Sequence, residues 1–152
     1  MGVGALAAAV VTHYAGQATI VGVEPTSAAC NFASAAAGAP VTVAGPHNSI
    51  MAGLNCGNVS PIAWPAVSRG VDVFVAIDDD AAERAMRDLA VAGVVAGETG
   101  AAGLAGLRAL VDCGDPAVHG VEMIDRTVLL LCTKRATDHE AYERIVGHPA
   151  LA

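Results

Sequence analysis

Hydrophobic and polar positions follow two different periods along the chain, and these periods predict helices and strands that alternate. Between residues 82 and 89 the apolar side chains recur at i, i+3, i+4 and i+7, which is the spacing of one buried helix face. Short β-branched runs predict strands over 18–23, 40–43, 71–77 and 127–131. Alternation of this kind predicts an α/β fold of three layers, in which a mostly parallel sheet carries helices on both faces.

Residues that begin or end helices lie between these runs. Helices are predicted over 5–15, 28–37, 50–54 and 99–111, and three more are expected to start near residues 61, 79 and 138. Gly38 is expected just after a helix end, where its freedom at positive φ is useful. Side-chain caps are expected from Thr26 or Ser27, from Asp78 or Asp79, and from Thr137 in a capping box with Glu140.

The composition changes this picture in one respect, because the apolar residues are small. The chain has 152 residues, which is the size of a single domain, and 54% of them are hydrophobic while 3% are aromatic. Ala, Val and Gly supply most of the apolar count, so we expect helices that lie close to the sheet and to each other.

Charge and cysteine spacing exclude several functions. The net charge is −7 and the eight Lys and Arg residues are scattered, with Lys134-Arg135 as the one adjacent pair, which argues against nucleic-acid binding. The apolar stretch 2–11 lacks a preceding cationic segment and is shorter than a membrane span, so a cytoplasmic protein without a membrane segment is expected. The four cysteines form no CxxC pair, and neither a metal site nor a disulfide framework is predicted from Cys30, Cys56, Cys113 and Cys132.

The first seven residues have the pattern of an anion-binding loop that runs into a helix. The glycines of Gly2-Val3-Gly4-Ala5-Leu6-Ala7 would let the backbone N–H groups approach a phosphate at the helix N-terminus. Gly2, Gly4 and Ala7 also fit a dinucleotide fingerprint, with Glu24 about 20 residues on as the acid that binds ribose. A strand normally precedes such a loop and would have to lie upstream of Met1. This stretch alone leaves both interpretations open.

Longer motifs favour the phosphate-binding interpretation over the dinucleotide fingerprint. The segments GVGALAAAVV, IVGVEPTSAACNFASAAAG, IMAGLNCG, AWPAVSRGVDVFVAI and GETGAAGLAGL occur in this order and cover nearly the whole chain. Together they resemble the C-terminal half of the diaminopropionate ammonia-lyase family, which are pyridoxal 5′-phosphate (PLP) enzymes of the tryptophan synthase β-chain-like fold, known as fold type II. The resemblance implies that residues 1–152 are one C-terminal portion of a PLP-dependent lyase catalytic domain that begins inside the phosphate-binding loop.

The resemblance also implies a set of cofactor-binding residues. Gly53 would line the site, Glu98 would lie near the cofactor ring, and Cys132 would face the pyridine nitrogen, where a neutral thiol can hydrogen-bond without protonating it. The family's turn Ser-Thr-Glu-Gly is replaced here by Cys132-Thr133-Lys134-Arg135, and loss of the glycine predicts strain. Backbone N–H groups would hold the phosphate at Gly2, Val3, Gly4, Ala5 and Leu6.

A cation site known in serine racemase is only partly matched. Glu24 and Ala28 fall at two of its positions, but the third oxygen ligand is replaced by Cys30, and a thiol suits a hard cation poorly. No metal is therefore predicted.

The implied reaction is α,β-elimination of a small amino-acid substrate, 2,3-diaminopropionate, to pyruvate and ammonia. In the family the Schiff-base lysine and the acid/base aspartate lie in the N-terminal half, and the single lysine here, Lys134, lies near the ring-nitrogen position. We therefore expect no catalytic residue in this chain, no activity without the missing N-terminal half, and a homodimer when complete. The alternatives are an NAD-type nucleotide-binding module that uses Gly2, Gly4, Ala7 and Glu24, and an inert remnant or interaction domain.

Overall fold

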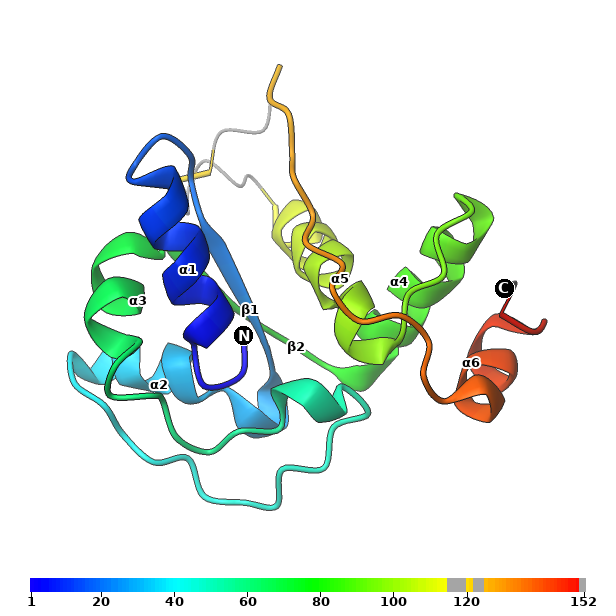
Figure 1. The fold of residues 1–152 in the computed structure, drawn as a ribbon, viewed down its shortest axis with the longest axis horizontal. Coiled ribbons are helices and arrows are strands. Elements are labelled where there is room, and N and C mark those ends of the chain that lie inside the picture. The colour runs from blue at the N-terminus through cyan, green and yellow to red at the C-terminus, as the bar shows by residue number, and fades with distance from the viewer. Residues whose placement is uncertain (115–119, 122–124, 151–152) are drawn as a thin grey trace.

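The computed structural model describes residues 1–114, 120–121 and 125–150, and these form an α/β arrangement (Figure 1). The first half contains α1 (Ala5–Tyr14), β1 (Val21–Pro25), the 3-10 turn η1 (Thr26–Ala28), α2 (Cys30–Ala37) and the 3-10 turn η2 (Ala52–Leu54). The second half contains α3 (Trp64–Gly70), β2 (Val73–Ile77), α4 (Asp79–Val91), α5 (Glu98–Asp112) and α6 (His139–Val146). None of the described helices is both long and apolar enough to cross a membrane.

The two strands pair in parallel, with Val21 opposite Val73 and Pro25 opposite Ile77. Because side chains alternate along a strand, Val23 and Ile77 pack on one face with α4 and α5, whereas Phe74 packs on the other with α3 and α1. Figure 1 shows α4 and α5 on one side of the strands and α1 and α3 on the other. The predicted three-layer fold with a parallel sheet is confirmed.

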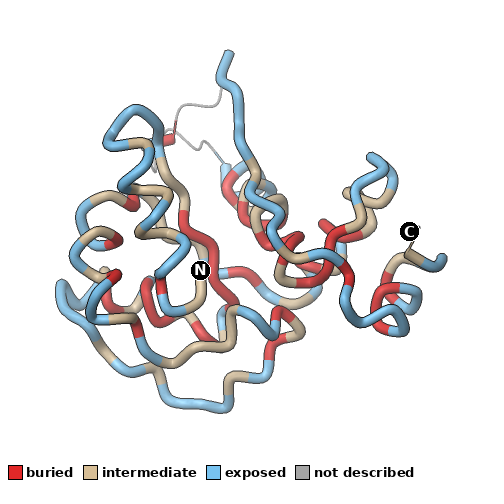
Figure 2. Tube along the Cα trace, viewed as in Figure 1, coloured by how far each residue is buried: buried red, intermediate tan, exposed pale blue. Residues whose placement is uncertain are grey.

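The larger part of the core lies between the strands and the second-half helices (Figure 2). Met86 of α4 and Tyr142 of α6 are almost completely buried there. Small residues of α5 bring this helix close to the sheet, since a Cβ on Gly106 would overlap the side chain of Val23. The expectation of closely packed small residues is therefore met at the centre of the molecule.

This close approach makes a stability prediction. Gly106→Ala is expected to lower the free energy of unfolding by about 1–3 kcal/mol, because α5 must move away from Val23. Gly103→Ala on the same helix is the matched control: the nearest atom to its Cβ would be Leu130 Cδ2 at 3.9 Å. Gly103→Ala should leave the free energy of unfolding unchanged or raise it, because alanine has a higher helix propensity than glycine. Urea unfolding of both variants measures the difference, and equal effects would show that α5 has room to move.

Two predicted strands are wrong. Residues 40–43 form no strand, and Val43 is held by a single backbone bond, from its N–H to the Gly57 carbonyl at 2.9 Å. Residues 127–131 run extended beside α5 without strand pairing, and Leu129 is 63% exposed. A β-branched run supplies the preference for extended backbone, but a strand also needs a neighbour, and no described residues pair with either segment.

The predicted helix ends are partly right. Asp78 caps α4 by accepting from the Ala81 N–H at 2.7 Å, and Gly38 ends α2 at φ 70°, as expected. Asp138 rather than Thr137 caps α6, because the first turn starts one residue later and Asp138 reaches the Ala141 N–H at 2.9 Å. Neither Thr26 nor Ser27 caps α2, since both belong to η1.

Candidate functional site

The N-terminal loop enters α1 through Gly4, which has φ 96°, a conformation that favours glycine. A Cβ on Gly4 would lie 3.0 Å from Asn31 Oδ1 and 3.3 Å from Val67 Cγ2, so the loop is packed against α2 and α3. Among residues 1–114, 120–121 and 125–150 no side chain caps α1, and its first turn contains no acid. The helix dipole and the first-turn N–H groups therefore remain available to an anion.

Gly53 in η2 joins this loop to the start of α5. A Cβ on Gly2 would lie 3.2 Å from the Gly53 carbonyl oxygen, and the Gly53 N–H donates to Thr99 Oγ1 at 3.2 Å. A Cβ on Gly53 would lie 3.2 Å from the Thr99 side chain, which is a tight contact, so the two segments are closely packed here. Close contacts therefore connect Gly2 to Gly53, and Gly53 to Thr99 in the first turn of α5.

Glu98 is the first residue of α5 and is 8% exposed. Within the described part of the chain, no group donates a hydrogen bond to its carboxylate. The N-terminal end of the α5 dipole favours its negative charge. Glu98 is therefore a buried acid beside Thr99, with hydrogen-bonding capacity left for a ligand.

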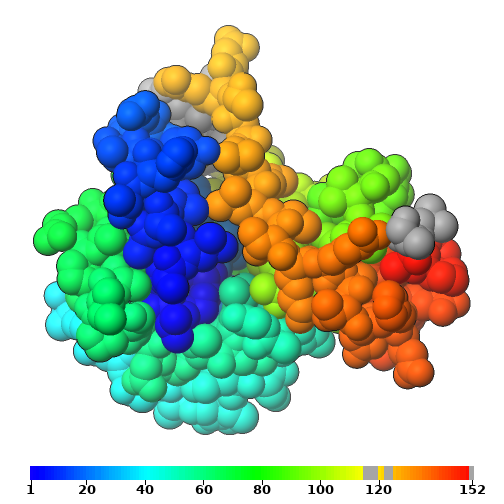
Figure 3. Space-filling view, in the orientation of Figure 1, coloured from blue at the N-terminus to red at the C-terminus, as the bar shows by residue number. Residues whose placement is uncertain are grey.

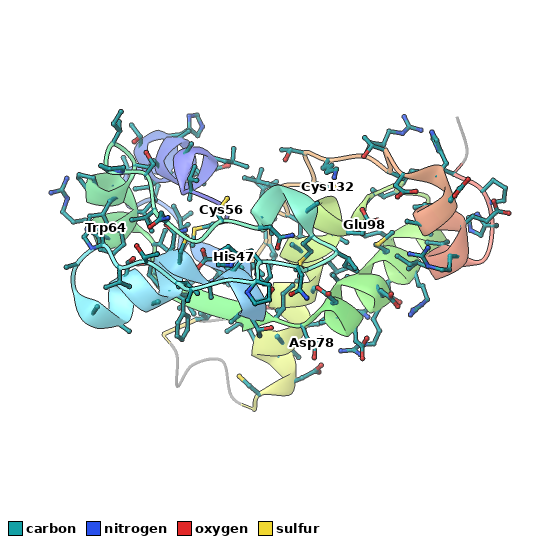
Figure 4. All side chains as sticks on the ribbon, turned by 90° about the horizontal axis from the view of Figure 1, so that it is seen from below. His47, Cys56, Trp64, Asp78, Glu98 and Cys132 are labelled. Atoms are coloured by element: carbon teal, nitrogen blue, oxygen red, sulfur yellow. The ribbon has the colours of Figure 1, made fainter. Side chains whose placement is uncertain are left out.

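Cys132 lies on the extended segment that follows α5 in sequence and folds back along its first turn. A Cβ on Gly100 would lie 3.1 Å from Cys132 Sγ, and the Gly97 N–H donates to the Lys134 carbonyl at 3.1 Å. Partial burial raises the pKa of the Cys132 thiol, which keeps it protonated at neutral pH. Figure 4 shows Cys132 and Glu98 on neighbouring segments, with Cys56 toward α1.

The strain predicted at the turn after Cys132 is wrong. Neither Lys134 nor Arg135 has a positive φ, so the backbone here does not use the conformational freedom of glycine. The Lys134 carbonyl is instead fixed by α5.

The structure thus brings the predicted residues of four segments to one face: the loop 2–6, Gly53, Glu98 and Cys132. In Figure 3 the N-terminal segment, the segment around η2 and residues 126–138 border one another on the visible face. Val3 and Leu6 are 43% and 55% exposed, so this end of α1 is accessible.

Glu24 does not reach that face. It is 1% exposed, and its carboxylate caps α2: Oε1 accepts from the Asn31 N–H at 3.1 Å and Oε2 from the Phe32 N–H at 2.8 Å. Asn31, which sequence reasoning missed, adds a bond from Nδ2 to Glu24 Oε1 at 2.8 Å. The sequence signal was a carboxylate at a strand end followed by a helix without a good cap of its own.

Cys30 lies beside Glu24 under the loop and is completely buried. Burial, together with the charge of Glu24, raises the pKa of its thiol from 9.0 to about 11. The unfolded thiol loses its proton near pH 9 and the folded thiol near pH 11, so in that window the unfolded chain binds fewer protons.

We therefore expect the free energy of unfolding to fall as pH rises from about 9 to 11, by at most about 1.4 kcal/mol per pH unit. Cys30→Ser should flatten this part of the profile, whereas Cys113→Ser, at an exposed position, should leave it unchanged. Urea unfolding across the pH range measures the slope. An unchanged slope in Cys30→Ser would assign the loss to other groups.

An α/β fold in which a glycine loop leads into an uncapped helix start is typical of proteins that bind an anionic cofactor. The chain belongs to the pyridoxal-phosphate dependent enzyme family, which its sequence matches over residues 1–133. It is 32% identical to diaminopropionate ammonia-lyase of Salmonella typhimurium over an alignment of 165 residues, covering 95% of this chain and 40% of that protein. The corresponding Escherichia coli enzyme is also 32% identical, over 82% of this chain and 33% of its own length.

Solved structures of PLP-dependent enzymes have the same fold as this chain. Holo diaminopropionate ammonia lyase from Escherichia coli matches with a TM-score of 0.81 and 30% identity, over 95% of this chain and 39% of that one. Threonine deaminase isoform 2 from Solanum lycopersicum matches with a TM-score of 0.82 at 20% identity, over 97% of this chain and 42% of that one, which shows the shared fold. The architecture is thus that of fold-type II PLP enzymes, and this chain spans about two fifths of the length of its relatives.

The residues present fit the family's cofactor. An uncapped helix N-terminus with two glycines, each close to neighbouring atoms, suits the phosphate of PLP. A buried acid without a described partner and a protonated thiol lie on the adjoining segments, where the ring of a bound pyridine would need polar contacts.

Proposed function

We propose that residues 1–152 supply the phosphate- and ring-binding part of a PLP-dependent ammonia-lyase that converts 2,3-diaminopropionate to pyruvate and ammonia by α,β-elimination. The observation that carries this proposal is the uncapped start of α1 at Gly4, in a loop whose Gly2 lies beside Gly53. Gly53 in turn contacts the first turn of α5, which begins at Glu98 and lies against Cys132. The identity to diaminopropionate ammonia-lyases supports the substrate. PLP, when bound, would supply the electron sink for loss of the α-proton and the β-amine.

The chain's own residues would bind and orient the cofactor. The N–H groups of residues 3–6 would donate to the phosphate, and the α1 dipole would stabilise its charge. The Cys132 thiol would donate to the pyridine nitrogen and leave it unprotonated, because the raised pKa of the thiol makes it a poor acid. Glu98 would accept a hydrogen bond beside the ring.

Proton transfer and covalent attachment need groups from other polypeptide. The sequence contains one lysine, Lys134, and its carbonyl is fixed by the Gly97 N–H beside Cys132, the proposed contact of the ring nitrogen. Because the ring nitrogen and the aldehyde lie on opposite sides of the pyridine, Lys134 is poorly placed for the aldehyde. The chain alone is therefore proposed to be inactive, and the complete enzyme to be a homodimer.

A nucleotide-binding function receives less support. A dinucleotide fingerprint needs an acid that is free to bind ribose hydroxyls. Both carboxylate oxygens of Glu24 instead accept from the first turn of α2, and the side chain is buried.

Isothermal titration of the chain with PLP, pyridoxal and NAD tests the proposal. Pyridoxal is the matched control, because it has the same ring and aldehyde and lacks the phosphate. PLP should bind at least about tenfold more tightly than pyridoxal, a difference of about 1.4 kcal/mol, and NAD should show no heat of binding. Tight NAD binding would favour the nucleotide module, and no heat with any ligand would favour a remnant.

A further inference from the structure

The side chain of Asn31 connects the cap of α2 to the N-terminal loop. Its Nδ2 donates to Glu24 Oε1 at 2.8 Å and to the Gly2 carbonyl at 2.7 Å. Both acceptors are oxygens, so the amide group has only this orientation; the reverse would place Oδ1 against two oxygens. Asn31 is completely buried, and both of its amide hydrogens are thereby committed.

The remaining atom of this amide faces the loop. Asn31 Oδ1 is buried without a hydrogen-bond partner among the described residues, and it lies 3.0 Å from where a Cβ on Gly4 would be. A buried amide oxygen without a partner costs free energy, about 1–3 kcal/mol. The two hydrogen bonds that Nδ2 donates offset that cost, and the bond to the Gly2 carbonyl stabilises the loop as well as the cap of α2.

The bond to the Gly2 carbonyl sets the direction of the next N–H. The peptide bond between Gly2 and Val3 is trans and planar, so the Val3 N–H points opposite to the Gly2 carbonyl. The Val3 carbonyl is held in the same way by the Ser60 N–H at 2.8 Å, and the Gly4 carbonyl by the Ala8 N–H at 2.8 Å. Three successive carbonyls are thus fixed, and of these the Gly2 carbonyl is held by side chains: Asn31 Nδ2 at 2.7 Å and, more weakly, Cys30 Sγ at 3.7 Å.

We propose that Asn31 is a positioning residue for the phosphate: it holds the Gly2 carbonyl toward α2 and so turns the Val3 N–H outward to the phosphate group of PLP. This inference rests on the proposed function. Glu24 fixes the Asn31 amide from the other side, so the buried strand-end acid acts on the loop through Asn31 and does not contact the ligand. Preorganisation of the donor spares the cost of ordering the loop when the phosphate binds.

Two variants and one control isolate this role. Asn31→Ala removes the donor. The double variant Glu24→Gln with Asn31→Asp exchanges amide and carboxylate, so the pair keeps its volume, its single charge and a mutual hydrogen bond. It gives up the bond from the residue-31 N–H to Oε1 and leaves the Gly2 carbonyl only the long contact from Cys30 Sγ at 3.7 Å. Ser34→Ala is the control: Ser34 is also completely buried in α2, and its Oγ accepts from the Val41 N–H at 3.0 Å, away from the loop.

The first measurement needs no ligand. In ¹⁵N relaxation of the free chain, the order parameter of the Val3 N–H should be near about 0.85 in the wild type and in Ser34→Ala, and below about 0.6 in both Asn31 variants. The second measurement is the dissociation constant for PLP and for pyridoxal. Both Asn31 variants should raise the constant for PLP by about tenfold or more and leave that for pyridoxal unchanged, while Ser34→Ala changes neither.

Each outcome decides the inference. Unchanged PLP affinity in the Asn31 variants overturns it, as does an equal loss in Ser34→Ala, which would reflect general loosening of α2. If Asn31→Ala does not fold, the double variant decides, because it preserves the volume and charge of the buried pair and the bond from the Phe32 N–H. If the wild-type chain binds no PLP, the proposed function fails, and the order parameters still show whether Asn31 fixes the loop: a rigid Val3 N–H in the variants overturns the inference on its own.

Discussion

Gly4→Ala is expected to weaken binding of PLP about 100-fold, equivalent to about 2.7 kcal/mol. An alanine at φ 96° carries a backbone penalty of about 1–2 kcal/mol. Its Cβ would in addition lie 3.0 Å from Asn31 Oδ1 and 3.3 Å from Val67 Cγ2, and because both side chains are buried we expect the loop to shift. Relief of both penalties moves the N–H groups that are proposed to bind the phosphate.

Gly16→Ala is the matched control for this prediction. Gly16 has a similar φ of 80°, but no atom of the described residues lies within 4 Å of where its Cβ would be. The control should lose a similar amount of stability through its backbone and keep its affinity for PLP. Titration of both variants with PLP and pyridoxal separates the effects. Equal PLP affinity in Gly4→Ala and in the wild type would mean that the loop does not hold the phosphate.

Lyase activity is expected only when a second stretch of polypeptide supplies the Schiff-base lysine. In a chimera, residues 1–152 replace the matching segment of Escherichia coli diaminopropionate ammonia-lyase, with which this chain shares 32% identity. The chimera should release ammonia and pyruvate from 2,3-diaminopropionate, whereas the isolated chain should release neither. This is the largest expected change in activity, because it runs from none to measurable turnover.

The same chimera carries its own controls. Gly4→Ala in the chimera should abolish most of the activity and Gly16→Ala should not, which ties turnover to the loop. Ammonia is measured with a coupled assay and pyruvate independently. A chimera that folds and binds PLP without releasing ammonia would assign this chain to another reaction of the family, and activity of the isolated chain would refute the need for a second part.

Most of the fold was predictable because its signals are local. The apolar spacing of α4, the Asp78 cap and the glycine at the end of α2 each depend on a few neighbouring residues. The two strands that failed, 40–43 and 127–131, depend on partners that local preference does not reveal. The same limit applies to the turn at Lys134, whose backbone is set by contact with Gly97 of a distant segment.

The candidate site was predictable only in part. Glycine spacing indicated the anion loop, and the longer motifs indicated Gly53, Glu98 and Cys132. The proposed role of Asn31 could not be found this way, because it depends on two acceptors, Glu24 and Gly2, that lie 7 and 29 residues away. One interpretation of the sequence took Glu24 as the acid that binds ribose, whereas in the structure its carboxylate accepts from backbone N–H groups of α2.

The central claim, that the start of α1 holds the cofactor phosphate, is tested most directly by mapping PLP onto the backbone amides by NMR. In ¹H–¹⁵N spectra recorded during a PLP titration, the largest shifts should fall on the N–H groups of residues 3–6, with smaller shifts at Gly53 and residues 98–100. Pyridoxal at the same concentration should leave residues 3–6 nearly unchanged, because it lacks the phosphate. Shifts that fall elsewhere, or that PLP and pyridoxal share at residues 3–6, would contradict the claim.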